Sequence, residues 1–225
     1  MKKILISFTL LFVFVFSAFA QEHDHEYAPL QEKEFKYKDW TYKNISTNED
    51  LNLREYAKDK KLVMVFYYAA WCANSKFQMP FTEKMYEKYK DQGLGVVGVS
   101  LYASLEKVQN GLKFNKMSFP IVTESVSTED RKDTAHYQYR KKSGDERKWG
   151  TPYNVFLIPG EFKDEGDVLT KKALVVSGEL MEAETEKFIR EKLGLPAETE
   201  SGKMTSKKDE FEPCEDSSKI SLKKN

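Results

Sequence analysis

Residues 62–76 read LVMVFYYAAWCANSK, and this stretch decides the fold that the sequence predicts. Its first seven residues are apolar or aromatic without interruption, which is typical of a strand buried on both faces of a sheet. Apolar residues then recur at four-residue spacing, as in an amphipathic helix, at Phe77, Phe81, Met85 and Tyr89. Cys72 is therefore expected where a buried strand ends and a helix of residues 72–90 begins.

Segments of the same two kinds follow along the chain. Residues 93–101 and 119–122 are predicted strands, with a predicted helix between them at residues 104–116. A charged segment at 125–149 holds a predicted helix that ends near residue 139. The remaining predicted elements are two strands and a closing helix, at 153–158, 173–177 and 182–193. This order indicates an α/β fold, a central mixed sheet with helices on both faces.

The N-terminus has the pattern of an export signal. Lys2 and Lys3 precede an apolar run, and Ala18-Phe19-Ala20 fits the cleavage site of a signal peptide over residues 1–20. The run is shorter than the roughly 20 residues that span a bilayer. We therefore expect an exported protein without a membrane anchor after cleavage, periplasmic in preference to secreted.

The mature chain is expected to form one domain with two extensions. In residues 21–50, aromatic residues alternate with charged ones, which favours a hairpin or edge strands. Residues 51–195 hold the predicted domain. Residues 196–225 are rich in Lys, Glu, Ser and Thr, and we expect them to be a disordered polar tail.

Composition excludes several classes of function. Basic and acidic side chains number 36 each, so a nucleic-acid partner is not expected. Only two cysteines occur, Cys72 and Cys214, which excludes a disulfide-rich scaffold. After cleavage, His23 would be third from a free amine, a geometry that can chelate Cu(II) or Ni(II). Short tracts such as the one with His23 and His25 are more often solvated linkers, so we predict no metal site and no cofactor.

The segments taken together resemble the thioredoxin fold, and more narrowly the exported TlpA/ResA-like thiol-disulfide oxidoreductases. The resemblance covers roughly residues 36–195 and rests on AWCANSK with the following QMP, then GLGVVGVSL, FPIV, GTPYNVFLI and ALVVSGEL. It implies that Cys72 is the nucleophile, with Trp71 shielding one side. It also implies that Thr151 and a cis Pro152 shape a groove for an extended substrate peptide. A helix N-terminus at Cys72 would favour the thiolate.

Three positions depart from the family pattern. The motif W-C-x-x-C-K has Ser75 in place of its second cysteine, and a serine oxygen cannot resolve a mixed disulfide by thiol exchange. The acid that thioredoxins place six residues before the first cysteine falls at Phe66, and the glutamate of TlpA/ResA-like proteins six residues after it falls at Gln78. Conventional dithiol reduction at Cys72 and Ser75 is therefore not expected.

Several hypotheses remain for a single thiol. Cys72 could exchange with substrate disulfides while an outside thiol, glutathione or a protein thiol, completes the cycle in cell-envelope redox homeostasis. Cys214 could instead act as a distant resolving thiol, since a 20-residue tether spans roughly 25 Å, or be an incidental tail thiol. The alternative class is a non-catalytic module that binds extended peptides or protein partners beside Pro152. A peroxidase is disfavoured, because no threonine and proline precede Cys72.

Two further features are interpreted as surface. His136 lies in a charged predicted helix, and we expect it to be exposed. The basic run at residues 140–142 is likewise expected to be a solvated face.

Overall fold

The structure is a computed structural model, and it describes residues 25–196. The predicted signal peptide, His23, Cys214 and the tail from residue 197 onward lie outside the described residues. Among residues 25–196, no helix combines the length and the apolar character that crossing a membrane requires.

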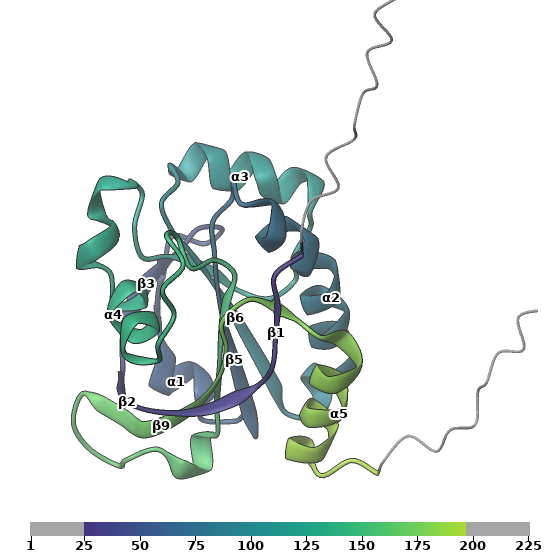
Figure 1. The fold of residues 1–225 in the computed structure, drawn as a ribbon. Helices are drawn as coiled ribbons and strands as arrows, with labels where there is room; N and C mark the ends of the chain where they lie inside the picture. The colour runs from purple at the N-terminus through teal and green to yellow at the C-terminus, as the bar shows by residue number, and fades with distance from the viewer. Residues whose placement is uncertain (1–24, 197–225) are drawn as a thin grey trace, which may run out of the picture.

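An eight-stranded mixed sheet forms the centre of the molecule, in the order β2-β9-β8-β5-β6-β7-β3-β4 (Figure 1). Three strands run parallel: β5 (Leu62–Tyr68), β6 (Leu94–Ser100) and β7 (Ile121–Thr123). On the other side of β5 the sheet continues with antiparallel neighbours, β8 (Tyr153–Leu157) and β9 (Val168–Val176). The predicted mixed sheet is confirmed.

The central strand β5 is buried along its whole length. Val63, Val65 and Tyr67 belong to one core cluster, whereas Met64 and Phe66 belong to the cluster on the opposite face of the sheet. Alternate side chains of a strand point to opposite faces, so an uninterrupted apolar run fits a strand that is covered on both.

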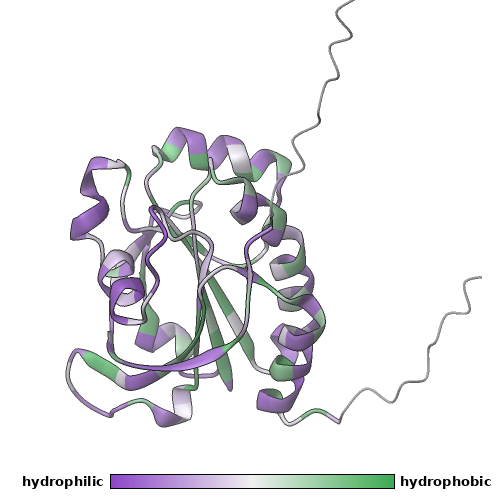
Figure 2. Cartoon of the chain, in the orientation of Figure 1, coloured by the Kyte–Doolittle hydropathy of each residue, from purple (hydrophilic) through white to green (hydrophobic). Residues whose placement is uncertain are grey.

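Helices cover both faces, as predicted. In one core cluster, the helical residues come from α2 (Ala73–Tyr89), α3 (Leu105–Phe114) and α5 (Glu182–Leu193). Those in the other cluster come from α1 (Leu53–Ala57) and α4 (Ala135–Lys142). Figure 2 shows hydrophobic residues concentrated in the central strands and hydrophilic residues spread over the helices around them.

The N-terminal segment contributes strands to the same sheet. Its elements are β1 (Tyr27–Ala28), β2 (Gln31–Lys38), β3 (Thr41–Asn44) and β4 (Asp50–Asn52). β2 is an edge strand on β9, and β3 lies at the far end between β7 and β4. β2 and β3 therefore do not pair with each other. The hairpin of this region joins β3 to β4. β1 pairs with β10 (Glu179–Leu180) in a separate two-stranded sheet.

The prediction for the charged segment before β8 needs correction. Its expected single helix is a 3-10 helix, η2 (Glu129–Asp133), followed by α4, which begins after the extended residue Thr134. His136 has no exposed surface and Arg140 is 1% exposed, so neither is the surface residue that the sequence indicated. Both are buried because their ring or guanidinium nitrogens bond to groups inside the protein.

Candidate functional site

Cys72 lies at the junction of β5 and α2. It is the N-cap residue of α2, with extended backbone angles (φ −77°, ψ 122°), and its half-buried side chain caps no backbone N–H. The first turn of this 17-residue helix contains no acidic residue. Cys72 therefore lies at the positive end of the helix dipole, and no residue of the first turn adds a negative charge there.

The thiol contacts the loop that precedes β8. We call residues 143–152, between α4 and β8, the Pro152 loop. Cys72 Sγ donates a hydrogen bond to the carbonyl oxygen of Thr151 at 3.3 Å, and the peptide bond between Thr151 and Pro152 is cis. The fold thus brings together the cysteine and the Thr151-Pro152 pair that the resemblance singled out.

Trp71 forms one wall beside Cys72. Its side chain is 39% exposed, and its indole Nε1 donates to the carbonyl oxygen of Tyr102 at 3.0 Å. The ring meets that of Trp149 edge to face, with 5.1 Å between the centroids. Trp71 is therefore held in place by one loop and packed against another.

Ser75 lies in the first turn of α2 but does not bond to Cys72. Its side chain has no exposed surface, and Oγ has no hydrogen-bond partner in residues 25–196. Asn74 Oδ1 and Thr151 Oγ1 are also buried without a partner in that part of the chain. The position of the missing cysteine is therefore occupied by a small, enclosed hydroxyl.

The groups beneath α2 carry no charge. Phe66 packs in the apolar cluster under this helix. Gln78 and Asn154 form a reciprocal pair, in which Gln78 Nε2 donates to Asn154 Oδ1 at 2.7 Å and Asn154 Nδ2 donates to Gln78 Oε1 at 3.2 Å. Further bonds tie this amide pair to the backbone of β10 and the residue before it, from Asn154 Nδ2 to Gly178 O and from Leu180 N to Gln78 Oε1.

Neither Phe66 nor Gln78 can take up or release a proton at neutral pH. The role of Asn154 was not foreseen. The only signal for it is a polar residue inside the apolar run of β8, YNVFL.

The N-terminal segment also lines the pocket that contains Cys72. Glu26 shares a pocket with Cys72 and Arg147. Its carbonyl oxygen accepts a hydrogen bond from Glu179 N at 2.7 Å. The Glu179 carboxylate is buried and accepts from Glu26 N while pairing with His25 Nδ1 at 2.9 Å. His25 is thus paired with a carboxylate, and the described residues contain no cluster suited to a metal ion.

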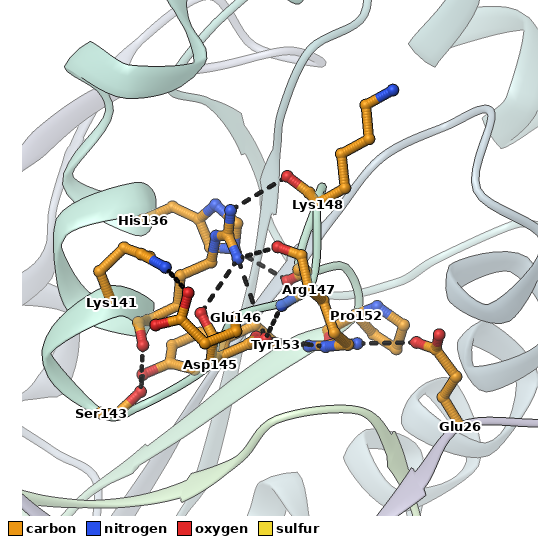
Figure 3. A network of polar contacts seen from close by, with 12 residues as sticks. Glu26, His136, Lys141, Ser143, Asp145, Glu146, Arg147, Lys148, Pro152 and Tyr153 are labelled. Atoms are coloured by element: carbon orange, nitrogen blue, oxygen red, sulfur yellow. Dashed lines mark hydrogen bonds and ion pairs between the residues drawn. The ribbon is translucent and has the colours of Figure 1, made fainter.

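An ion-pair network connects this segment to the Pro152 loop (Figure 3). The Arg147 guanidinium bonds to the buried Asp145 carboxylate, to Glu26 Oε2 at 3.0 Å and to the Pro152 carbonyl oxygen at 3.0 Å. Burial acts to lower the pKa of Arg147, but its hydrogen bonds and charge pairing with Asp145 outweigh that effect and raise it. Arg147 therefore stays charged and joins the loop to the N-terminal segment.

Part of the chain is similar in sequence to a known bacterial protein. A relative in bacteria, the thiol-disulfide oxidoreductase ResA of Oceanobacillus iheyensis, is 30% identical over 84 residues. The match covers 37% of this chain and 44% of the relative, so the chain spans less than half the length of the relative it matches.

Two solved structures have the same fold. A thiol:disulfide interchange protein of the thioredoxin family from Chlorobium tepidum TLS has a TM-score of 0.53 at 16% identity, over 72% of this chain and 98% of that one. A thiol:disulfide interchange protein from Bacteroides sp. has a TM-score of 0.52 at 17% identity, over 74% and 93% of the two chains. At these identities the likeness establishes the thioredoxin-like fold alone.

A family model also matches the chain. The model described as the AhpC/TSA family matches residues 33–158, more than half of the chain. The matched range begins in β2, includes Cys72 and the Pro152 loop, and ends just after β8. On this evidence the protein belongs to the AhpC/TSA family.

Proposed function

We propose that this protein is an exported, monothiol thiol-disulfide exchange protein in which Cys72 is the nucleophile. The observation that carries the proposal is the contact of the Cys72 thiol with the Thr151 carbonyl beside the cis Pro152, at the N-terminus of α2. The thiol is partly accessible there, between Trp71 and the Pro152 loop. The export pattern of residues 1–20 supports a cell-envelope location, the periplasm in particular.

The first step is attack by the Cys72 thiolate on one sulfur of a substrate disulfide. A bond forms between Sγ and that sulfur, the substrate disulfide breaks, and the other substrate sulfur leaves as a thiolate. The Sγ proton, which the thiol uses in its hydrogen bond to the Thr151 carbonyl, is lost to solvent before this attack. The product is a mixed disulfide between Cys72 and one half of the substrate.

Ser75 cannot perform the second step. Its oxygen is no substitute for a resolving thiol, and its burial in α2 keeps it from solvent. A second thiolate, from glutathione or a protein, attacks the mixed disulfide, so that Cys72 leaves as a thiolate and the new disulfide carries the substrate half. Cys214 is the other candidate for this thiol. The Cys214→Ser variant therefore tests whether Cys214 is needed.

The test is turnover of a peptide disulfide by the mature chain, with glutathione as the final reductant. We expect the Cys214→Ser protein to retain activity and to depend on the glutathione concentration. We expect Cys72→Ala to fall to the uncatalysed rate. Ser75→Ala is the matched control within the same helical turn, and it should leave the rate nearly unchanged.

Two results would refute the proposal. Full activity of Cys72→Ala would remove Cys72 from the chemistry. A wild-type protein that binds peptides beside Pro152 but forms no disulfide with them would identify the protein as a non-catalytic binding module.

A further inference from the structure

The helix α4 packs beside the site without contributing a residue to the exchange chemistry. Two of its side chains, His136 and Arg140, lie four residues apart and therefore on one face of the helix. Both are buried, and both bond to backbone carbonyls of the Pro152 loop. They are the buried polar groups for which the proposed exchange reaction gives no role.

His136 connects the Pro152 loop to Tyr102. Its Nε2 lies 3.0 Å from the Gly150 carbonyl oxygen, and its Nδ1 lies 2.9 Å from the Tyr102 hydroxyl. A carbonyl can only accept, so Nε2 carries the proton and Nδ1 accepts from Tyr102. Burial, followed by the positive charge of Arg140, lowers the pKa of His136 to about 3, and the ring is neutral at physiological pH.

Tyr102 continues the connection to Trp71. It has a left-handed backbone conformation (φ 57°), which costs a residue with a side chain roughly 1 kcal/mol. Its backbone is fixed on both sides, because its N–H donates to Ser125 Oγ at 3.0 Å and its carbonyl accepts from Trp71 Nε1. A series of hydrogen bonds through His136 and Tyr102 thus connects Gly150 to Trp71. Gly150 precedes Thr151, and Trp71 precedes Cys72.

Arg140 supports the same loop from the next turn of α4. Its guanidinium donates to the carbonyl oxygens of Asp145, Arg147 and Lys148. Gly150 has a φ of 62°, and a side chain there would place its Cβ 2.5 Å from Arg140 Cδ. The loop therefore closes over Arg140 only with glycine at this position.

From these contacts we propose that His136 and Tyr102 are positioning residues that fix Trp71 and the Thr151-Pro152 backbone beside Cys72, and thereby select peptide disulfides over small disulfides. The inference rests on the proposed exchange function. An extended peptide must fit between both walls while its sulfur reaches Sγ, whereas a small disulfide needs only access to Sγ. Misplacement by about 1 Å can reduce the rate of a positioned reaction by on the order of a hundredfold.

The test compares His136→Asn with His136→Gln in the Cys214→Ser background. The Gln amide can reach the Gly150 carbonyl from the place of Nε2, whereas the shorter Asn side chain keeps only the acceptor for Tyr102. We expect His136→Asn to slow exchange with a peptide disulfide by about tenfold or more, with less than about a twofold change for a small aromatic disulfide. His136→Gln, which regains the bond to Gly150 but not the one to Tyr102, should restore part of the peptide rate.

Hydrogen-deuterium exchange of residues 144–150 supplies a readout that does not depend on disulfide chemistry. Faster exchange there in His136→Asn, and not in His136→Gln, is expected. Ile189→Ala, in the core on the α5 side of the sheet, is the control for a general loss of stability. It should not change the ratio of the peptide rate to the small-disulfide rate.

The inference is overturned if His136→Asn lowers both rates equally, or if the Gln and Asn variants behave alike. If His136→Asn does not fold, Tyr102→Phe is the variant to measure, because it removes the hydroxyl that donates to His136. It should lower the ratio of the peptide rate to the small-disulfide rate. If the wild-type protein reacts with neither disulfide, the exchange function fails. The hydrogen-exchange result then still shows whether His136 holds the loop.

Discussion

The two sides of Cys72 are built from different kinds of residues. On the helix side, beneath α2, Phe66 and the amide pair of Gln78 and Asn154 carry no charge. On the loop side, the Pro152 loop is held by the buried ions Arg140 and Asp145. The helix side even leaves the Ser75 hydroxyl without a partner in the described part of the chain.

This difference separates two tasks that a disulfide-exchange site usually combines. Resolving a mixed disulfide and moving its protons would require thiols or acids on the helix side, where this chain has a serine, a phenylalanine and a glutamine. Holding a substrate against the thiol requires a fixed loop, and the buried ions Arg140 and Asp145 hold the Pro152 loop. The proposed function therefore assigns the formation of a mixed disulfide to this site and its resolution to another thiol.

Removing the main support of the loop should have the largest effect on stability. Arg140→Met leaves three loop carbonyls and part of the Asp145 charge without their partner, and we expect a loss of about 4 kcal/mol in the free energy of unfolding. Urea denaturation would measure it. Lys142→Met, at an exposed position of the same helix, should change stability by less than about 0.5 kcal/mol. Similar losses in the two variants would contradict the account of the loop.

Acid should weaken the loop side through His136. The folded protein keeps this ring neutral down to about pH 3, whereas the unfolded chain takes up the proton below about pH 6.5. Stability is therefore lost as pH falls through this interval, by about 3 kcal/mol between pH 7 and pH 4 from this group. The difference between wild type and His136→Gln across a pH series isolates the contribution. Parallel pH curves for the two proteins would show that His136 is not buried as a neutral ring.

A carboxylate at position 78 should destabilise this protein, although the family pattern has a glutamate there. In Gln78→Glu the ionised carboxylate can no longer donate to Asn154 Oδ1, and its burial costs about 2 kcal/mol at pH 8. Burial raises the pKa of such a carboxyl, so stability is lost as pH rises, and the variant should approach wild type near pH 4. Gln109→Glu, on an exposed face of α3, is the control. A loss that is the same at both pH values would argue against the buried amide pair.

The smallest expected effect is a gain in stability. Ser75→Ala removes from a helix a buried hydroxyl that has no partner among residues 25–196, which should stabilise the protein by about 1 kcal/mol. Thermal unfolding would measure it. A loss of similar size would mean that Ser75 Oγ makes a bond in solution.

Much of the helix side could be predicted from the sequence. The apolar run of β5 and the four-residue spacing after it determine where Cys72 lies, since both patterns are local. The closing helix α5 has the bounds that its periodicity predicts, and Gly194 ends it in the left-handed conformation. The neutral residues at positions 66 and 78 follow from the motif spacing alone.

The loop side could not be predicted in the same way. His136 and Arg140 look like exposed residues of a charged helix, because the carbonyls that satisfy them belong to a loop whose path is set by tertiary structure. The strand partners of β2 and β3 were missed for a related reason. Alternation marks a strand with one buried face but does not say which strand it pairs with.

The most direct test of the central claim is the lifetime of the mixed disulfide at Cys72. The Cys214→Ser protein would be mixed with a peptide disulfide, and intact mass would be followed before and after glutathione is added. We predict one adduct, at Cys72, that persists until glutathione is added, and a short-lived adduct in the Ser75→Cys variant. No adduct at Cys72, or an adduct that disappears without added thiol, would contradict the account.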